Sequence, residues 1–161
     1  MKIEKDNQIG FTLIEIIIVV GLLVFVAYII LSTNFSSYRS YSFRDERDTL
    51  INNLQRMRSL AMNNICYGTC TSGTSHSVHF ETSEYILYQG EDWDSHDSEA
   101  DEIVKINPVM QISGPTDIVF TPLSGDVTVT PSGSYDITLT DNMSHSSVIT
   151  LNKVGQIKWT N

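Results

Sequence analysis

Residues 10–31, GFTLIEIIIVVGLLVFVAYIIL, differ in composition from the polar remainder of the chain. The 21 residues from Phe11 to Leu31 carry one charged side chain, that of Glu15. As a helix they would span roughly 31 Å, about the thickness of the hydrocarbon core of a bilayer. A carboxylate inside such a span costs about 2.5–3.5 kcal/mol on insertion scales, so its presence indicates a function. The sequence therefore predicts a membrane-spanning helix with a functional acid near its start.

Two ordinary explanations of this apolar run are incomplete. A secretory signal peptide has a shorter apolar core and a small-x-small cleavage site, which residues 32–41, STNFSSYRSY, do not supply. A plain membrane anchor explains the length and, by the positive-inside rule, places Lys2 and Lys5 on the cytoplasmic side. The plain anchor leaves Glu15 unexplained.

The first ten residues, MKIEKDNQIG, form a short charged leader that ends in Gly10, and FTLIE follows directly. This combination resembles the class III signal of type IV pilins and type II secretion pseudopilins. The resemblance implies that a prepilin peptidase cleaves between Gly10 and Phe11 and that Phe11 is then N-methylated. It also implies that Glu15 neutralises the new amine, in its own chain or in a neighbouring subunit during filament assembly, because a buried charge needs a partner.

The amphipathic continuation of this helix is expected over residues 32–63, which contain no proline or glycine. Apolar residues recur there at helical spacing and predict one face packed on a globular domain: Phe43, Leu50, Leu54, Met57 and Ala61. The charged side chains between them, arginines included, are expected on the solvated faces. We therefore expect one continuous helix from about Phe11 to about Asn63, with residues 11–31 in the membrane.

Residues 64–161 are expected to form a globular β domain. Short alternating segments separated by turn residues predict eight or nine strands: HSVHFE, EYILYQ, EIVKI, VMQIS, DIVFT, DVTVT, SYDITLT, SVITL and QIKW. The predicted fold class is α+β, a long N-terminal helix packed on an antiparallel β-sandwich or two packed sheets. The segments VFTPLSG (119–125) and ITLNKVGQI (149–157) resemble those of H-type minor pseudopilins and related minor pilins. This resemblance implies a pilin-like fold.

Cys66 and Cys70 are the two cysteines of the chain, separated by three residues in NNICYGTCTSG. A disulfide is expected if this part of the chain is exported into an oxidising compartment. Free thiols and a metal site with His76 and His79 are the alternatives, although Cys-x3-Cys followed by His-x2-His is not a usual zinc spacing.

An acidic segment, residues 90–102 (GEDWDSHDSEADE), carries seven carboxylates. Asp92, Asp94 and Asp97 are weak calcium candidates, since calcium takes six to eight oxygen ligands. The spacing does not follow an EF-hand, and a solvated loop is the expectation. Trp93 is expected either to contact a partner or to cap the adjacent core.

The composition bears on other functions as well. A net charge of −9 makes nucleic acid an unlikely partner, although DNA-uptake minor pilins exist and Lys153 and Lys158 lie near the C-terminus. Neither a nucleophile elbow nor a phosphate loop is present, so we expect no enzymatic activity and no cofactor.

The expected function is that of a minor pilin or pseudopilin, a structural subunit in the inner membrane and then in a filament, at or near its tip. The resemblance implies three kinds of partner: other pilins, the prepilin peptidase and the inner-membrane platform protein. The C-terminal domain is expected on the periplasmic or extracellular side. The alternative is a membrane-anchored module that binds a ligand, as an adhesin or a DNA-uptake minor pilin does.

Overall fold

The computed structural model describes residues 11–33, 35–68 and 73–160. The chain divides into two compact units, Met1–Ser40 and Tyr41–Asn161. The predicted leader, residues 1–10 with Gly10, lies outside the described residues. The two units are described separately below.

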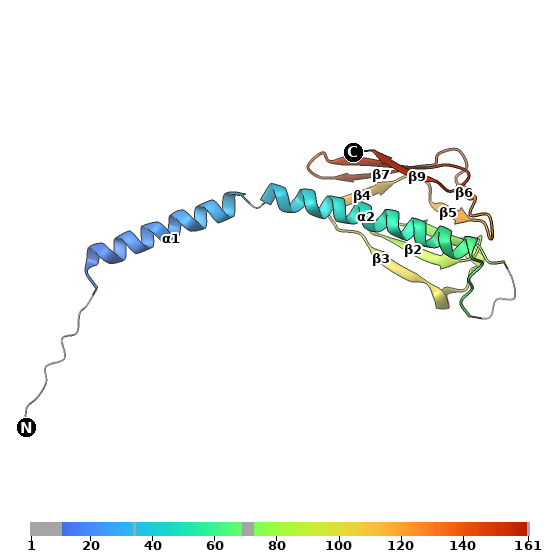
Figure 1. Cartoon of the computed structure of the whole chain (residues 1–161), viewed down its shortest axis with the longest axis horizontal. Coiled ribbons are helices and arrows are strands. Elements are labelled where there is room, and N and C mark those ends of the chain that lie inside the picture. The colour runs from blue at the N-terminus through green and yellow to red at the C-terminus, as the bar shows by residue number, and fades with distance from the viewer. Residues whose placement is uncertain (1–10, 34, 69–72, 161) are drawn as a thin grey trace, which may run out of the picture. The chain divides into compact units, whose positions relative to one another are not determined.

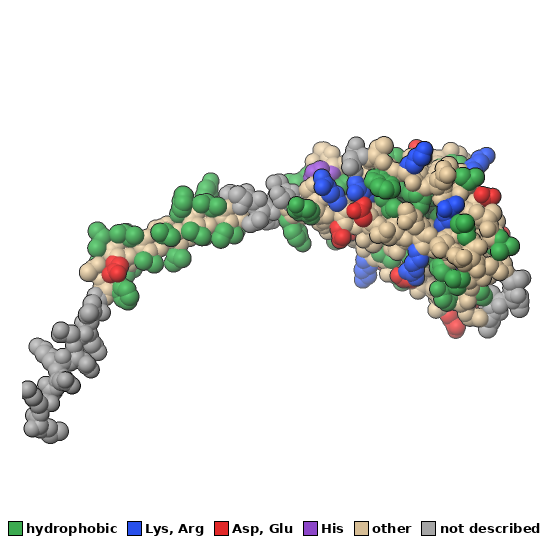
Figure 2. Space-filling view, viewed as in Figure 1, with side chains coloured by type: hydrophobic (Ala, Val, Ile, Leu, Met, Phe, Trp, Pro, Cys, Tyr) green, Lys and Arg blue, Asp and Glu red, His purple; other side chains and the backbone are tan. Residues whose placement is uncertain are grey.

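The first unit is built on α1 (Leu13–Thr33), which contains the predicted apolar span. Residues Leu13–Leu31 have a mean hydropathy of 3.0, and none of the helix window is buried within the protein. Figure 2 shows this helix coated with hydrophobic side chains. By length and composition α1 is able to cross a membrane.

Helix α2 (Phe35–Met62) follows; it begins in the first unit and continues from Tyr41 in the second. Among the described residues of the second unit no other helix is longer than three residues. The predicted helix from Phe11 to Asn63 is thus observed as two described helices, and its continuity stays a prediction because Asn34 lies outside the described residues. The end of α2 has a local cause. Asn64 adopts φ 52°, the left-handed conformation that ends many helices.

The rest of the second unit consists of antiparallel strands in two sheets (Figure 1). The first sheet has the order β3-β2-β1-β5-β6 and the second the order β4-β7-β8-β9. The bounds are β1 (His76–Phe80), β2 (Glu84–Gln89), β3 (Glu102–Lys105), β4 (Met110–Ser113), β5 (Asp117–Phe120), β6 (Val127–Thr130), β7 (Asp136–Asp141), β8 (Ser146–Leu151) and β9 (Ile157–Thr160). The predicted α+β class and the nine antiparallel strands are confirmed; the chain leaves the first sheet after β3 and returns to it for β5.

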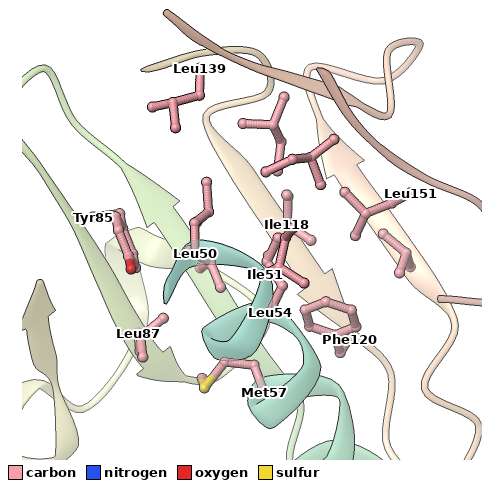
Figure 3. Packing of buried hydrophobic residues seen from close by; sticks show 14 of the residues in the cluster. Leu50, Ile51, Leu54, Met57, Tyr85, Leu87, Ile118, Phe120, Leu139 and Leu151 are labelled. Carbon is pink, nitrogen blue, oxygen red and sulfur yellow. The ribbon is translucent and has the colours of Figure 1, made fainter. Parts of the chain in front are cut away.

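One hydrophobic core joins α2 to both sheets (Figure 3). Every residue of the predicted apolar face of α2 is buried, and Ile51 joins them. Opposite the helix lie side chains of the first sheet, such as Ile118 and Phe120, and of the second, such as Leu139 and Leu151. Because α2 contributes to the same core as both sheets, the domain is not a sandwich of two sheets alone.

Arg47 departs from the expectation of a solvated arginine face. It is 8% exposed and lies among the buried residues of α2, where its guanidinium pairs with Asp48 at 2.8 Å. Position 47 lies four residues after Phe43 and three before Leu50, which places it on the apolar face. A long side chain is tolerated there because its methylene stem packs against apolar neighbours while the head reaches a carboxylate.

Candidate functional site

The first turn of α1 contains the acid that the sequence singled out. Thr12 precedes the helix, and the backbone N–H of Glu15 donates to the Thr12 carbonyl (3.1 Å) and hydroxyl (3.4 Å). This is the N-cap arrangement, and Thr-x-x-Glu is the sequence signature of a capping box. Glu15 also lies at the positive end of the helix dipole. The local sequence therefore starts α1 at Thr12 and places Glu15 in its first turn.

Phe11 and Glu15 share one side of this helix start. Together with Ile16, Val19 and Val20 they line an open hollow of about 240 Å³. Phe11 is 80% exposed. Phe11 and Glu15 are four residues apart in the chain, about one helical turn.

The segment that carries Cys66 is fixed against the first sheet. The buried ring of His76 hydrogen-bonds the Ile65 carbonyl through Nε2 (2.7 Å), and burial lowers the pKa of this imidazole. The side chain of Gln89 bonds both the N–H and the carbonyl of Tyr67. Cys66 is not a free thiol. Cys70 lies outside the described residues, so the Cys66–Cys70 pairing stays a prediction.

The acidic loop, residues 91–101, is an ordered element between β2 and β3. It contains two short 3-10 helices, η1 (Trp93–Ser95) and η2 (Ser98–Ala100). Asp92 accepts a hydrogen bond from the Asp94 N–H, and Asp97 accepts one from the Glu99 N–H, so each caps a helix. Two of the three calcium candidates thus have structural partners.

A stack of aromatic rings holds the acidic loop on the sheet. The indole of Trp93 lies parallel to the His79 ring at 4.1 Å between centroids and stacks on His96 at 4.6 Å. Tyr88 of β2 meets the edge of the same indole at 5.3 Å. Burial raises the pKa of Tyr88 to about 12, so the phenol is neutral at physiological pH. Of the two roles expected for Trp93, the structure supports capping of the adjacent core.

Each histidine of the stack is paired with a carboxylate. His79 Nδ1 lies 2.7 Å from Asp117 Oδ1, a contact set by the register of β1 against β5, and His96 Nε2 lies 2.9 Å from Asp101 Oδ2. Burial opposes protonation of His96, but the hydrogen bonds to Asp101 and to the Trp93 carbonyl outweigh it and raise the pKa of His96. The stack is thus most strongly held when His96 is charged.

The geometry does not assemble a metal site from these groups. Among the described residues no group of three or more His, Cys, Asp or Glu side chains is placed to hold a metal ion. His76 and His79 lie three residues apart on β1, hence on opposite faces, and bind different partners. Within the same described residues, no hydroxyl or thiol is hydrogen-bonded to a histidine ring.

No family model, curated protein or solved structure matches this chain.

Two features of the candidate sites were missed by sequence reasoning. The Thr12 cap had a readable signal, Thr-x-x-Glu before an apolar run. The aromatic stack had none, because His79 and Trp93 are brought together only by the path of the loop over β1 and β2.

Proposed function

We propose that this chain is a minor pilin or pseudopilin, a subunit that a prepilin peptidase processes and that assembles into a filament through α1. The observation that carries the proposal is the start of α1. An apolar helix of membrane-spanning length begins at a Thr12 cap directly after the Gly10–Phe11 junction, with its one acid in the first turn. A helix used only as an anchor does not need that acid.

The chemistry of assembly follows from the same geometry. Cleavage after Gly10 would leave a cationic amine on Phe11, one turn from Glu15 at the dipole's positive end. Moving that amine from the bilayer surface into a dry bundle of helices is costly unless a carboxylate pairs with it. Glu15 of the same chain, or of the neighbour, supplies the partner, and the neighbour's acid would set the register between subunits.

The β domain fits this proposal as the part that faces outward. Its core is complete without α1, since every residue of the core cluster lies between Phe43 and Ile157. In the proposed arrangement α1 stands in the inner membrane before assembly and in the filament afterwards. Lys2 and Lys5 would remain on the cytoplasmic side with the leader.

The test is the intact mass of the protein recovered from its native membrane. We expect a mass that lacks residues 1–10 and includes one methyl group on Phe11. A Gly10→Leu variant is the matched control and should retain its full length. An uncut, unmethylated wild-type chain would contradict the proposal and leave α1 as an ordinary anchor. The same spectrum without reductant would show two fewer protons if Cys66 and Cys70 are bridged.

A further inference from the structure

A groove of about 710 Å³ lies on the β domain, between the last turns of α2 and the start of β9. Arg58 and Met62 line it from the helix, and Ile157 and Lys158 line it from the strand. β9 is an edge strand that pairs with β8 alone. The groove thus lies beside an exposed sheet edge, and its lining combines apolar, polar and charged groups.

The charge of the groove is opposite to that of the chain. The protein has 19 acids and 10 bases, yet the lining residues include two cations, Arg58 and Lys158, and no carboxylate. Arg58 is held in place by hydrogen bonds to the carbonyls of Val154 (2.9 Å) and Gly125 (3.4 Å). Within the described residues, Lys158 is in no ion pair, and the exposed strand end keeps it in water.

The complementary surface is the acidic loop, residues 91–101. Asp94 and Glu99 are exposed, and no described hydrogen bond or ion pair occupies their carboxylates. The caps and the ring stack on Trp93 already fix the shape of this loop. Docking a pre-ordered loop therefore costs less conformational entropy than ordering a flexible one. Opposite charge on the two surfaces favours one orientation of approach.

We infer that the groove of one copy receives the acidic loop of a second copy of this chain. Lys158 faces Asp94 or Glu99 in this contact, and the apolar floor of Met62 and Ile157 is covered. Because each chain has one groove and one loop, the contact is heterologous and propagates head to tail. A net charge of −9 repels copies in dilute solution, so the contact forms where α1 concentrates them in a membrane. It does not require cleavage after Gly10.

The direct test joins the two charges covalently. The full-length chain, half of it labelled with nitrogen-15, is reconstituted into lipid vesicles and treated with a carbodiimide. This reagent condenses a lysine amine with a touching carboxylate into an amide, and water is transferred to the carbodiimide. We expect peptides of mixed isotope that link Lys158 to Asp94 or Glu99. Links from Lys158 only to other carboxylates, or only within one chain, would overturn the inference.

Charge reversal provides an independent test by energy transfer between N-terminally labelled copies in vesicles. Lys158→Glu, or Asp94→Lys with Glu99→Lys, should each reduce association about tenfold, since close charge pairs couple by more than 1.4 kcal/mol. Lys105→Glu, an exposed lysine outside the groove, should leave association unchanged. Mixing the two defective variants should restore pairs, because one keeps the loop and the other the groove. Equal effects of Lys158→Glu and Lys105→Glu would refute the contact.

Discussion

At the scale of single residues, a local effect of Glu15 on the start of α1 must be distinguished from its proposed role as the partner of an amine in filament assembly. Glu15→Gln removes the charge and keeps the shape. We expect membrane insertion to persist and recovery in sheared filaments to fall at least about tenfold, since breaking a buried charge pair costs about 3–5 kcal/mol. Immunoblots of the membrane and filament fractions measure both.

Thr12→Ala is the matched control for Glu15, because it removes the hydroxyl that caps α1 and keeps the acid. It should cost about 1 kcal/mol of helix stability and leave filament recovery close to wild type. If Thr12→Ala reduced filament recovery as much as Glu15→Gln, the acid would act through the helix start and not through an amine.

His96 provides a prediction about pH. Its pKa is raised in the folded protein, so its stabilising contribution is complete below the pKa of the unfolded chain and is lost as the pH rises through the folded value. His96→Gln should therefore cost more stability at about pH 5.5 than at about pH 8.5. Urea unfolding of the full chain in detergent, followed by tryptophan fluorescence, measures the difference. An equal cost at both pH values would contradict the charged pair with Asp101.

At the scale of elements, α2 is held to the sheets by apolar contact. Leu54 of α2 is fully buried on the face of the helix that packs against the sheets, and replacing it by Ala leaves a cavity. Leu54→Ala should lower the free energy of unfolding by about 2–5 kcal/mol. Gln55→Ala, the next residue on the exposed side, should change it by less than about 0.5 kcal/mol. A small effect at Leu54, measured by urea unfolding, would mean that α2 does not pack as the structure has it.

The turn before β9 depends on a close backbone approach at Gly155. This glycine has φ 74°, and a Cβ there would collide with the Arg58 side chain and the Gly125 carbonyl. Gly68 has φ 83°, and none of the described residues lies within 4 Å of a Cβ placed there, so Gly68→Ala is the comparison for backbone strain. Gly155→Ala should destabilise by about 1–3 kcal/mol more than Gly68→Ala. Similar unfolding midpoints for the two variants would show that the contact yields easily.

At the scale of the whole molecule, the proposed function requires the β domain to be exported. A C-terminal alkaline phosphatase fusion should be active in cells, because in the proposed topology Lys2 and Lys5 hold the leader in the cytoplasm and α1 crosses the membrane once. Deletion of residues 13–31 should leave the same fusion inactive. An active fusion without α1 would assign export to another segment.

Most of the helices and strands could be predicted from the sequence because their apolar residues are periodic. The buried face of α2 and the strands from EYILYQ to QIKW follow periodicities of 3.6 and 2, and each strand was placed within a few residues. The burial of Arg47 is not predictable in this way, because a charged side chain indicates solvent exposure even at a position on the apolar face of the helix. The order of the strands in the sheets could not be predicted either. β1 pairs with its sequence neighbour β2 on one side but with β5 on the other, and β5 is far from β1 in the sequence.

Local chemistry is what the sequence determined by itself: the apolar span of α1, its start at Thr12 with an acid in the first turn, and the turns that separate the strands. These features depend on side chains within one helical turn or one hairpin of each other. The tertiary structure alone decided which distant groups meet. It paired His79 with Asp117 on the neighbouring strand, stacked Trp93 on His79 and on His96, and placed Arg58 and Lys158 in one groove. Such contacts depend on strand order and register, which no local pattern encodes.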